Sequence, residues 1–234
     1  MAQPINILST RPIDSALIET AGSKDIFIEV KSFIETIPVQ SAAITQEIEN
    51  ALSKSATVIF TSMNAVDAVA KHLNGRKPQW NIYCIGTTTD ELVKKYFGEG
   101  LITGTAYNAA DLAALIIKDR FIDEVIFFCG NQRRNELPDM LRNNDIIVHE
   151  TEVYKTIAVT HKINSAFNGI LFFSPSAVEC FFSNNTINEQ TILFAIGNTT
   201  AGAIKQFTGN KIIISATPGK ENLAEQMIAY FAGD

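Results

Sequence analysis

The sequence predicts an α/β fold with two similar flavodoxin-like domains, one of them discontinuous, each built on a parallel five-stranded sheet. Short apolar runs alternate with amphipathic stretches along the 234 residues, which is typical of parallel strands that helices cover on both faces. Segment 60–66 recurs as 172–178, whereas 24–28 recurs at a wider spacing as 144–148. Two copies of one design are therefore present, and the second copy is rearranged.

The two spacings predict how the domains divide the chain. Segment 24–28, near the start of the chain, matches segment 144–148, at the end of the first copy. We therefore expect 1–36 plus 157–234 to form a discontinuous α/β domain. The inserted α/β domain then covers 42–150. The linkers 37–41 and 151–156 lie in aligned segments rich in β-forming residues, which predicts a two-stranded hinge beside a cleft.

Each expected strand is a short apolar run, and each expected helix follows a polar or glycine-containing turn. The helical period is clear at 221–231, where Leu223, Met227 and Ile228 share one face. The inserted domain should hold strands at 57–61, 81–85, 101–103, 124–129 and 146–150, and the other domain strands at 5–9, 26–30, 170–173, 192–196 and 211–215. Helices are expected at 13–22, 42–53, 64–73, 88–97, 109–118, 135–143, 176–183, 199–207 and 221–231.

Composition excludes several classes of protein. The three cysteines lie far apart, which favours buried free thiols and a reducing cytoplasm over disulfides. The three histidines lack the spacing of metal ligands, so no metal site is expected. A net charge of −6 without a basic stripe argues against nucleic acid, and no apolar run is long enough for a membrane span or a signal peptide.

Loops rich in Ser, Thr, Gly and Asn follow six of the expected strands. In parallel sheets ligands collect at these carboxyl ends, where helix N-termini offer backbone N–H groups to anions. N-capping alone is the competing interpretation of each loop. Their repetition favours a polyanion held by neutral donors. The loops are 9–11, 61–64, 86–89, 130–134, 174–176 and 197–200.

Three further residues stand out near these loops. Tyr154 aligns with Ile34 in the repeat, so one linker carries a phenol, a neutral proton donor at pH 7, where the other is aliphatic. Packing of its ring is the alternative role. Arg11 and Arg133 are expected basic residues of the cleft, with Pro12 as the first helical residue after Arg11. Dinucleotide, P-loop and nucleophile-elbow motifs are missing from the sequence.

In order along nearly the whole chain, these segments resemble the uroporphyrinogen-III synthase family. The resemblance rests on Ser9-Thr10-Arg11-Pro12, Phe60-Thr61-Ser62 with Asn64-Ala65-Val66, Ile85-Gly86 with Thr89, Gly130-Asn131 with Arg133-Arg134 and Leu137-Pro138, Val153-Tyr154 with Thr156, Phe173-Ser174-Pro175-Ser176-Ala177-Val178, and Ala195-Ile196-Gly197 with Thr199-Thr200. Family members often have a proline at the entry to the first linker, where this chain has Lys31-Ser32.

The resemblance implies two α/β domains and a cofactor-free reaction in the cleft. Hydroxymethylbilane, a linear tetrapyrrole, would lose its terminal hydroxyl as water and close with inversion of ring D. Tyr154 is the implied acid for the leaving hydroxyl. The expected substrate-binding residues are Arg11, Ser62, Asn64, Gly86, Thr89, Gly130, Arg133, Ser174, Ser176, Gly197, Thr199 and Thr200.

The expected molecule is a cytoplasmic monomer that makes at most transient contact with hydroxymethylbilane synthase. Two other classes stay open from the residues alone. One is a two-lobed anion-binding module, and the other is a cleft enzyme acting on a phosphorylated metabolite, because the same loops suit phosphate.

Overall fold

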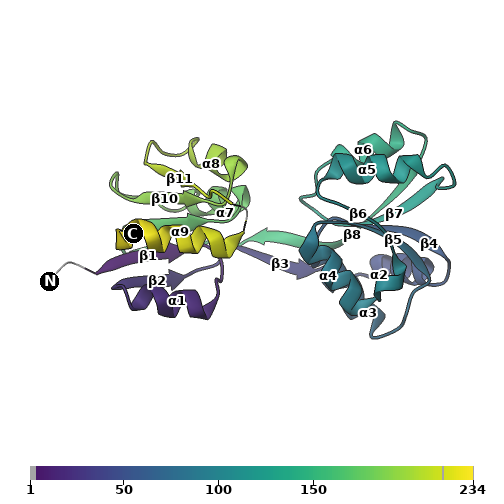
Figure 1. Cartoon of the computed structure of the whole chain (residues 1–234), viewed down its shortest axis with the longest axis horizontal. Helices are drawn as coiled ribbons and strands as arrows, with labels where there is room; N and C mark the ends of the chain where they lie inside the picture. The colour runs from purple at the N-terminus through teal and green to yellow at the C-terminus, as the bar shows by residue number, and fades with distance from the viewer. Residues whose placement is uncertain (1–3, 218, 234) are drawn as a thin grey trace. The chain divides into compact units, whose positions relative to one another are not determined.

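The computed structural model describes residues 4–217 and 219–233, and the chain divides into two compact units. One unit combines Met1–Glu35 with Ile157–Asp234, and the other is the continuous segment Thr36–Thr156. We call them the split unit and the continuous unit. Segments from opposite ends of the sequence thus share one sheet in the split unit (Figure 1).

The continuous unit contains a six-stranded sheet in the order β3-β8-β7-β4-β5-β6. Its strands β8, β7, β4, β5 and β6 pair in parallel, as predicted. The bounds are β3 (Ile34–Pro38), β4 (Ala56–Phe60), β5 (Trp80–Ile85), β6 (Ile102–Ala106), β7 (Glu124–Gly130) and β8 (Ile147–Ala158).

The split unit contains a parallel five-stranded sheet in the order β11-β10-β9-β1-β2. The N-terminal strand β1 lies at its centre and pairs with both β2 and β9. The bounds are β1 (Ile5–Ser9), β2 (Ile26–Val30), β9 (Gly169–Phe172), β10 (Ile192–Ala195) and β11 (Ile212–Ile214).

The two sheets have the same strand order, which explains the rearranged repeat. β6-β5-β4-β7-β8 corresponds strand for strand to β11-β10-β9-β1-β2. Counted from β4 or from β9, both orders are 3-2-1-4-5. The doubly wound parallel architecture is as predicted, and its order differs in detail from the order 2-1-3-4-5 of flavodoxin itself. The sequence repeat identifies equivalent strands in the two units, but it does not determine which strands lie side by side in each sheet.

Helices cover both faces of the continuous unit's sheet (Figure 1). Ile48, Val69 and Val93 from α2, α3 and α4 are buried against one face. Leu112 and Leu141 from α5 and α6 are buried against the other face. The bounds are α2 (Ala42–Leu52), α3 (Met63–Leu73), α4 (Thr87–Tyr96), the short 3₁₀ helix η1 (Glu99–Leu101), α5 (Ala109–Lys118) and α6 (Glu136–Arg142).

The split unit has the same three layers. Val178 of α7 and Ile204 of α8 pack on one face, and Ala21 of α1 and Met227 of α9 pack on the other. The bounds are α1 (Ser15–Gly22), α7 (Pro175–Phe182), α8 (Asn198–Ile204) and α9 (Lys220–Ala232). No helix in the described parts of the chain is long and apolar enough to cross a membrane.

Strand β8 runs through the segment that we expected to be a linker. It continues unbroken over 151–156, and β3 already begins at Ile34. The Val39 N–H donates to the Val153 carbonyl and the Val159 N–H to the Phe33 carbonyl, each at 2.9 Å. Later residues on one side therefore pair with earlier residues on the other, so β3 and β8 are antiparallel. The apolar and β-branched residues of both segments favour this pairing.

Helix α1 begins later than predicted. Its N-cap is Asp14, whose carboxylate accepts a hydrogen bond from the Ala16 N–H at 2.9 Å. Pro12 is therefore not the first helical residue, and Arg11 precedes the helix by several residues. An aspartate that satisfies a free helical N–H is a stronger start signal than the proline.

Candidate active site

The strand order predicts where a ligand would lie in the continuous unit. β4 and β7 are neighbours with Phe60 opposite Phe128, and the helices that follow them, α3 and α6, pack on opposite faces of the sheet. Ligands of doubly wound sheets bind at the carboxyl ends of the strands at such a switch point. The loop with Ser62 follows β4, and the loop with Arg133 follows Gly130, the last residue of β7, so both predicted loops meet there.

A β-bulge directs Tyr154 towards the same point. Cys129 pairs with Glu152, but Gly130 pairs with Tyr154, so Val153 is an extra residue in β8. Val153 is buried in the core beneath α2, α3 and α4, and Tyr154 packs partly against that core. Successive strand residues normally point to opposite faces. The bulge lets these two share one face.

Gly130 makes room for the tyrosine ring. A Cβ atom at Gly130 would lie 2.4 Å from Tyr154 Cζ and 2.8 Å from its hydroxyl oxygen. Any side chain at this position would displace the ring. The structure thus gives Gly130 a packing role that the sequence did not reveal.

Tyr154 and Ser62 form the polar centre of this site. The Tyr154 hydroxyl donates to Ser62 Oγ at 3.1 Å, and the same oxygen caps α3 by accepting from the Asn64 N–H at 3.2 Å. Ser62 is therefore an N-cap, as the competing interpretation held, and also the partner of the phenol. Tyr154 and Asn64 also line one small cavity beside α3.

Asn131 fixes the loop after β7 to β8, a role that we did not predict. Its side-chain oxygen accepts from the Thr156 N–H at 2.8 Å, and its Nδ2 donates to the Thr156 carbonyl at 3.3 Å. Its own N–H donates to the Tyr154 carbonyl at 3.3 Å. The Gly130-Asn131 pair, a typical turn sequence, was the available signal.

Helix α4 offers backbone donors that no side chain satisfies. Its N-cap is Gly86, at φ 80°, a left-handed value that favours glycine, and it makes no side-chain capping bond. The first N–H groups of a helix have no partner within it, so those of 87–89 are available to an anion. Thr89 itself is buried, whereas Thr87 and Thr88 are exposed.

The split unit repeats this division between capped and uncapped helices. Ser174 caps α7 by accepting from the Ala177 N–H at 3.2 Å, and Ser176 lies in the first turn of that helix. Gly197 precedes α8 without a side-chain cap. Thr200 is buried, as Thr89 is, and Thr199 is exposed. Among the predicted loops of each unit, one thus supplies a serine that caps its helix and another supplies a glycine that makes no side-chain capping bond.

The two predicted arginines differ in what they contact. Arg133 forms an ion pair with Glu150 and donates to Asn135 Oδ1 at 2.7 Å, so its guanidinium is already engaged. Glu150 also accepts from Arg142 at 2.5 Å. The side chain of Arg11 is exposed and has no ion-pair partner among the described residues.

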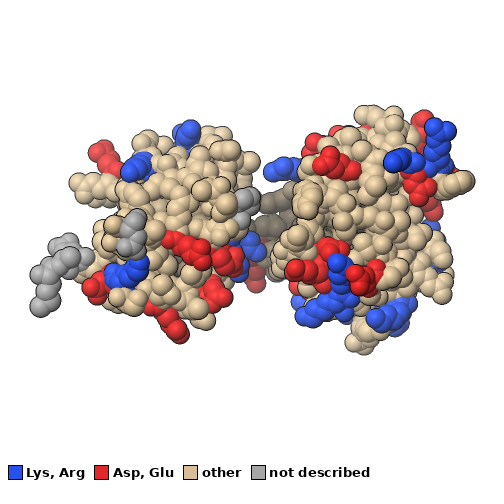
Figure 2. Space-filling model, in the orientation of Figure 1, with Lys and Arg blue, Asp and Glu red and all other residues tan. Residues whose placement is uncertain are grey.

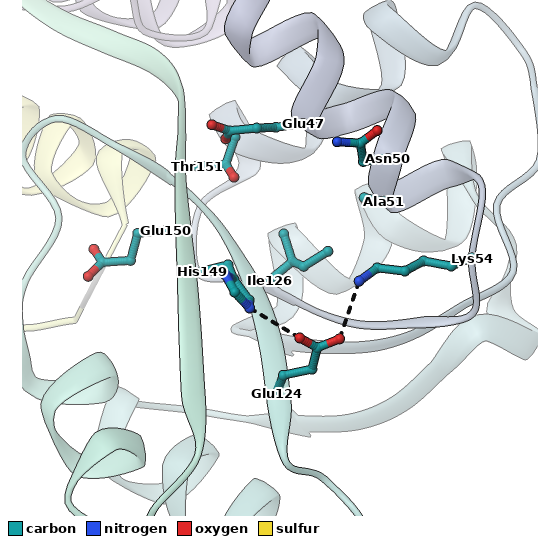
Figure 3. Close-up of a pocket in the computed structure, with 9 residues that line it drawn as sticks. All are labelled: Glu47, Asn50, Ala51, Lys54, Glu124, Ile126, His149, Glu150 and Thr151. Carbon is teal, nitrogen blue, oxygen red and sulfur yellow. Dashed lines mark hydrogen bonds and ion pairs between the residues drawn. The ribbon is translucent and has the colours of Figure 1, made fainter.

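A cavity of about 420 Å³ lies elsewhere in the continuous unit, between α2 and strands β7 and β8 (Figure 3). At one end of it, Glu124 Oε1 accepts from Lys54 at 3.2 Å and Oε2 lies 3.1 Å from His149 Nε2. Hydrogen bonds from Lys54 and His149 hold the pKa of Glu124 below its usual value. The cavity contains none of the predicted site residues. Lys54 and His149 are both engaged by Glu124. Glu124 is the first residue of β7, so it lies at the opposite end of that strand from the predicted loops.

The cysteines are buried and free, as predicted. Burial raises the pKa of the Cys84 and Cys129 thiols to about 11, so neither is a thiolate near neutral pH. Within 4–217 and 219–233, no three His, Cys, Asp or Glu side chains gather as metal ligands would. Acidic and basic side chains are interspersed on the drawn face of the continuous unit (Figure 2).

Comparison with known proteins decides the family. The model of the family described as uroporphyrinogen-III synthase HemD matches residues 15–225, most of the chain. The chain belongs to the uroporphyrinogen-III synthase family. Uroporphyrinogen-III synthases are enzymes of haem biosynthesis with a tetrapyrrole substrate, and that reading of the sequence is confirmed.

Solved structures agree with the fold of a uroporphyrinogen-III synthase. The uroporphyrinogen-III synthetase from Helicobacter pylori has a TM-score of 0.68 at 16% identity, covering 97% of this chain and 99% of that one. A mutant uroporphyrinogen III synthase from Thermus thermophilus has a TM-score of 0.66 at 12% identity, covering 97% of each chain. At such low identity, these likenesses show the fold alone.

Proposed function

We propose that this uroporphyrinogen-III synthase uses Tyr154 as the proton donor when hydroxymethylbilane loses its terminal hydroxyl. The observation that carries this proposal is the Tyr154–Ser62 hydrogen bond at the switch point of the continuous unit. Ser62 Oγ already accepts from Asn64, so the serine has a fixed position from which to hold the phenol. Tyr154 is half-buried and lines the small cavity beside α3, from which a bound substrate would approach it.

The chemical step balances with the substrate's own electrons. As the carbon–oxygen bond breaks, the pyrrole nitrogen supplies the electron pair and the phenol supplies the proton, so that water leaves. The substituted α-carbon of ring D attacks the exocyclic carbon of the azafulvene cation and forms a spiro-pyrrolenine. The bond from that α-carbon to the bridge of ring C then breaks, and the bridge carbon bonds to the free α-carbon of ring D, so that ring D is inverted. The proton lost as the ring regains aromaticity returns to the Tyr154 phenolate. The overall change is loss of water with cyclisation, which makes the enzyme a hydro-lyase.

Orientation is the second part of the proposal. The substrate bears acetate and propionate carboxylates on every ring, and it closes unaided, without inversion, to the type I isomer. Free N–H groups at the start of α4, next to Gly86, and the loop donors of the split unit suit such carboxylates. Holding the reacting atoms in one pose is worth several orders of magnitude in rate. The donors thereby select the inverted product.

We further propose that the enzyme works in the cytoplasm as a monomer without a cofactor, and that contact with hydroxymethylbilane synthase is at most transient. Buried free thiols suit a reducing compartment. These proposals rest on the residues and on the family.

Uroporphyrinogen III, kept reduced, is expected to raise the melting temperature of the protein by several degrees. A ligand that binds only the folded state at 100 times its Kd stabilises that state by about 2.7 kcal/mol. Differential scanning fluorimetry measures the shift, with ATP and NAD as controls that should leave the melting temperature unchanged. Stabilisation by a nucleotide, without any by uroporphyrinogen III, would instead indicate an enzyme of phosphorylated metabolites.

A further inference from the structure

A groove runs along helix α3 of the continuous unit and begins at Tyr154. A small cavity of about 90 Å³ is lined by Tyr154, Asn64 and residues further along α3. A cavity of about 530 Å³ between the start of α2 and the second half of α3 adjoins it. Both cavities are lined by Pro38, Ala68 and Lys71. We call these two cavities together the α3 groove.

Lys71 is the cation of the α3 groove that other side chains leave unpaired. Its side chain is exposed and has no ion-pair partner among the described residues. The neighbouring basic residues, Arg76 and His72, do have an acidic partner. Arg76 Nη1 donates to Glu49 Oε2 at 2.8 Å, and His72 Nε2 lies 3.3 Å from Glu49 Oε1. Both carboxylate oxygens of Glu49 are therefore engaged by Arg76 and His72, and neither pairs with Lys71.

Asp67, the acidic residue that lines the α3 groove, interacts with a residue other than Lys71. Asp67 lies one turn before Lys71 on α3, but the two form no ion pair. Asp67 instead lies close enough to Tyr96 to raise the pKa of that phenol. An unpaired lysine and a separately engaged aspartate thus set the local charge of the groove.

We propose that the α3 groove holds one carboxylate arm of the tetrapyrrole and that Lys71 is the cation that binds it. This inference rests on the proposed function, which supplies the polyanionic substrate. A lysine ammonium is a compact, strongly hydrated point charge on a flexible stem, which suits a carboxylate that arrives from solvent. The groove adds a charged contact next to the neutral hydroxyls of Tyr154 and Ser62.

The position of Lys71 determines the kind of effect to expect. Lys71 follows Asn64 by seven helical residues, or about 10 Å along the axis at 1.5 Å per residue. Its side chain lines the same small cavity as Tyr154, but the hydrogen-bond partner of the Tyr154 hydroxyl is Ser62 and not Lys71. Lys71 is thus a binding and positioning residue, and its loss should raise KM while leaving kcat nearly unchanged.

The test compares Lys71→Met with Lys118→Met. Both lysines are exposed and lie in the last turn of a helix of the continuous unit, so both variants lose the same charge and helix-dipole contact. Lys118 lines neither cavity of the α3 groove. We expect Lys71→Met to raise the KM for hydroxymethylbilane about three- to five-fold, as for loss of an exposed ion pair. Lys118→Met should keep the wild-type KM.

Two further variants test the sign of the effect. Lys71→Arg keeps the charge and should restore KM to near the wild-type value. Asp67→Asn removes the negative charge of the groove and should lower KM. Equal KM values for Lys71→Met and wild type, or a higher KM for Asp67→Asn, would overturn the role of Lys71.

The same experiment separates this inference from the proposed function. If the wild-type protein forms the type III isomer but Lys71→Met has an unchanged KM, only the groove proposal fails. If the wild-type protein forms no type III isomer, the proposed function fails, and the Lys71 proposal fails with it.

Discussion

Replacing Tyr154 by phenylalanine is expected to lower the rate of type III isomer formation by about 10²- to 10⁴-fold, the range that a general acid supplies. The ring keeps its packing against the core beneath α2, α3 and α4, because only the hydroxyl is removed. The hydrogen bond to Ser62 is lost, which costs about 0.5–1.5 kcal/mol of folding free energy. The protein should therefore fold, and the spontaneous type I isomer should accumulate.

Tyr83→Phe is the matched control for this variant. Tyr83 lies in β5 of the same unit, but its ring is buried on the opposite face of the sheet, against α5 and α6. Removing its hydroxyl should leave both the rate and the isomer ratio unchanged. Chromatographic separation of the oxidised uroporphyrin isomers measures both quantities. If folded Tyr154→Phe protein kept the wild-type rate and ratio, Tyr154 would have no part in the mechanism.

Gly130→Ala is expected to reduce type III formation to about the level of Tyr154→Phe, although the substitution removes no hydroxyl from the site. The new Cβ would lie 2.4 Å from Tyr154 Cζ, so the ring and its hydroxyl must move away from Ser62. Overpacking of this kind costs about 1–3 kcal/mol of folding free energy. Activity should be compared per folded molecule, after the melting temperature has been determined.

Gly104→Ala separates crowding in general from displacement of Tyr154. Gly104 lies in β6 of the same unit, and its Cβ would lie 2.5 Å from Leu115 and 2.9 Å from the Tyr83 ring. This variant should lose comparable stability but keep its activity per folded molecule. If both glycine variants lost activity equally, crowding anywhere in the unit would explain the loss, and Gly130 would have no special relation to Tyr154.

Much of the fold could be predicted because the local sequence pattern indicates the strands and helices, and the repeat spacings indicate which segments share a domain. Every expected strand and helix is present, since buried parallel strands are short apolar runs that polar turns separate. The two repeat spacings also implied that β1 and β2 share a sheet with β9, as the observed pairing shows. Local pattern and long-range pairing thus agree in this chain.

The geometry of the candidate site was less predictable, because it depends on strand register. The bulge that pairs Gly130 with Tyr154 has no local signal beyond the glycine. The ion pair of Arg133 with Glu150 joins a loop to a neighbouring strand. Such contacts between segments are set by three-dimensional packing, which residue type and spacing do not determine.

The most direct measurement is the isomer composition of the product that the wild-type protein forms from freshly generated hydroxymethylbilane. We expect the type III isomer to predominate, and to form faster than the type I isomer forms without protein. A product consisting of type I isomer alone, at the rate of the uncatalysed closure, would contradict the proposal that this chain closes the ring with inversion.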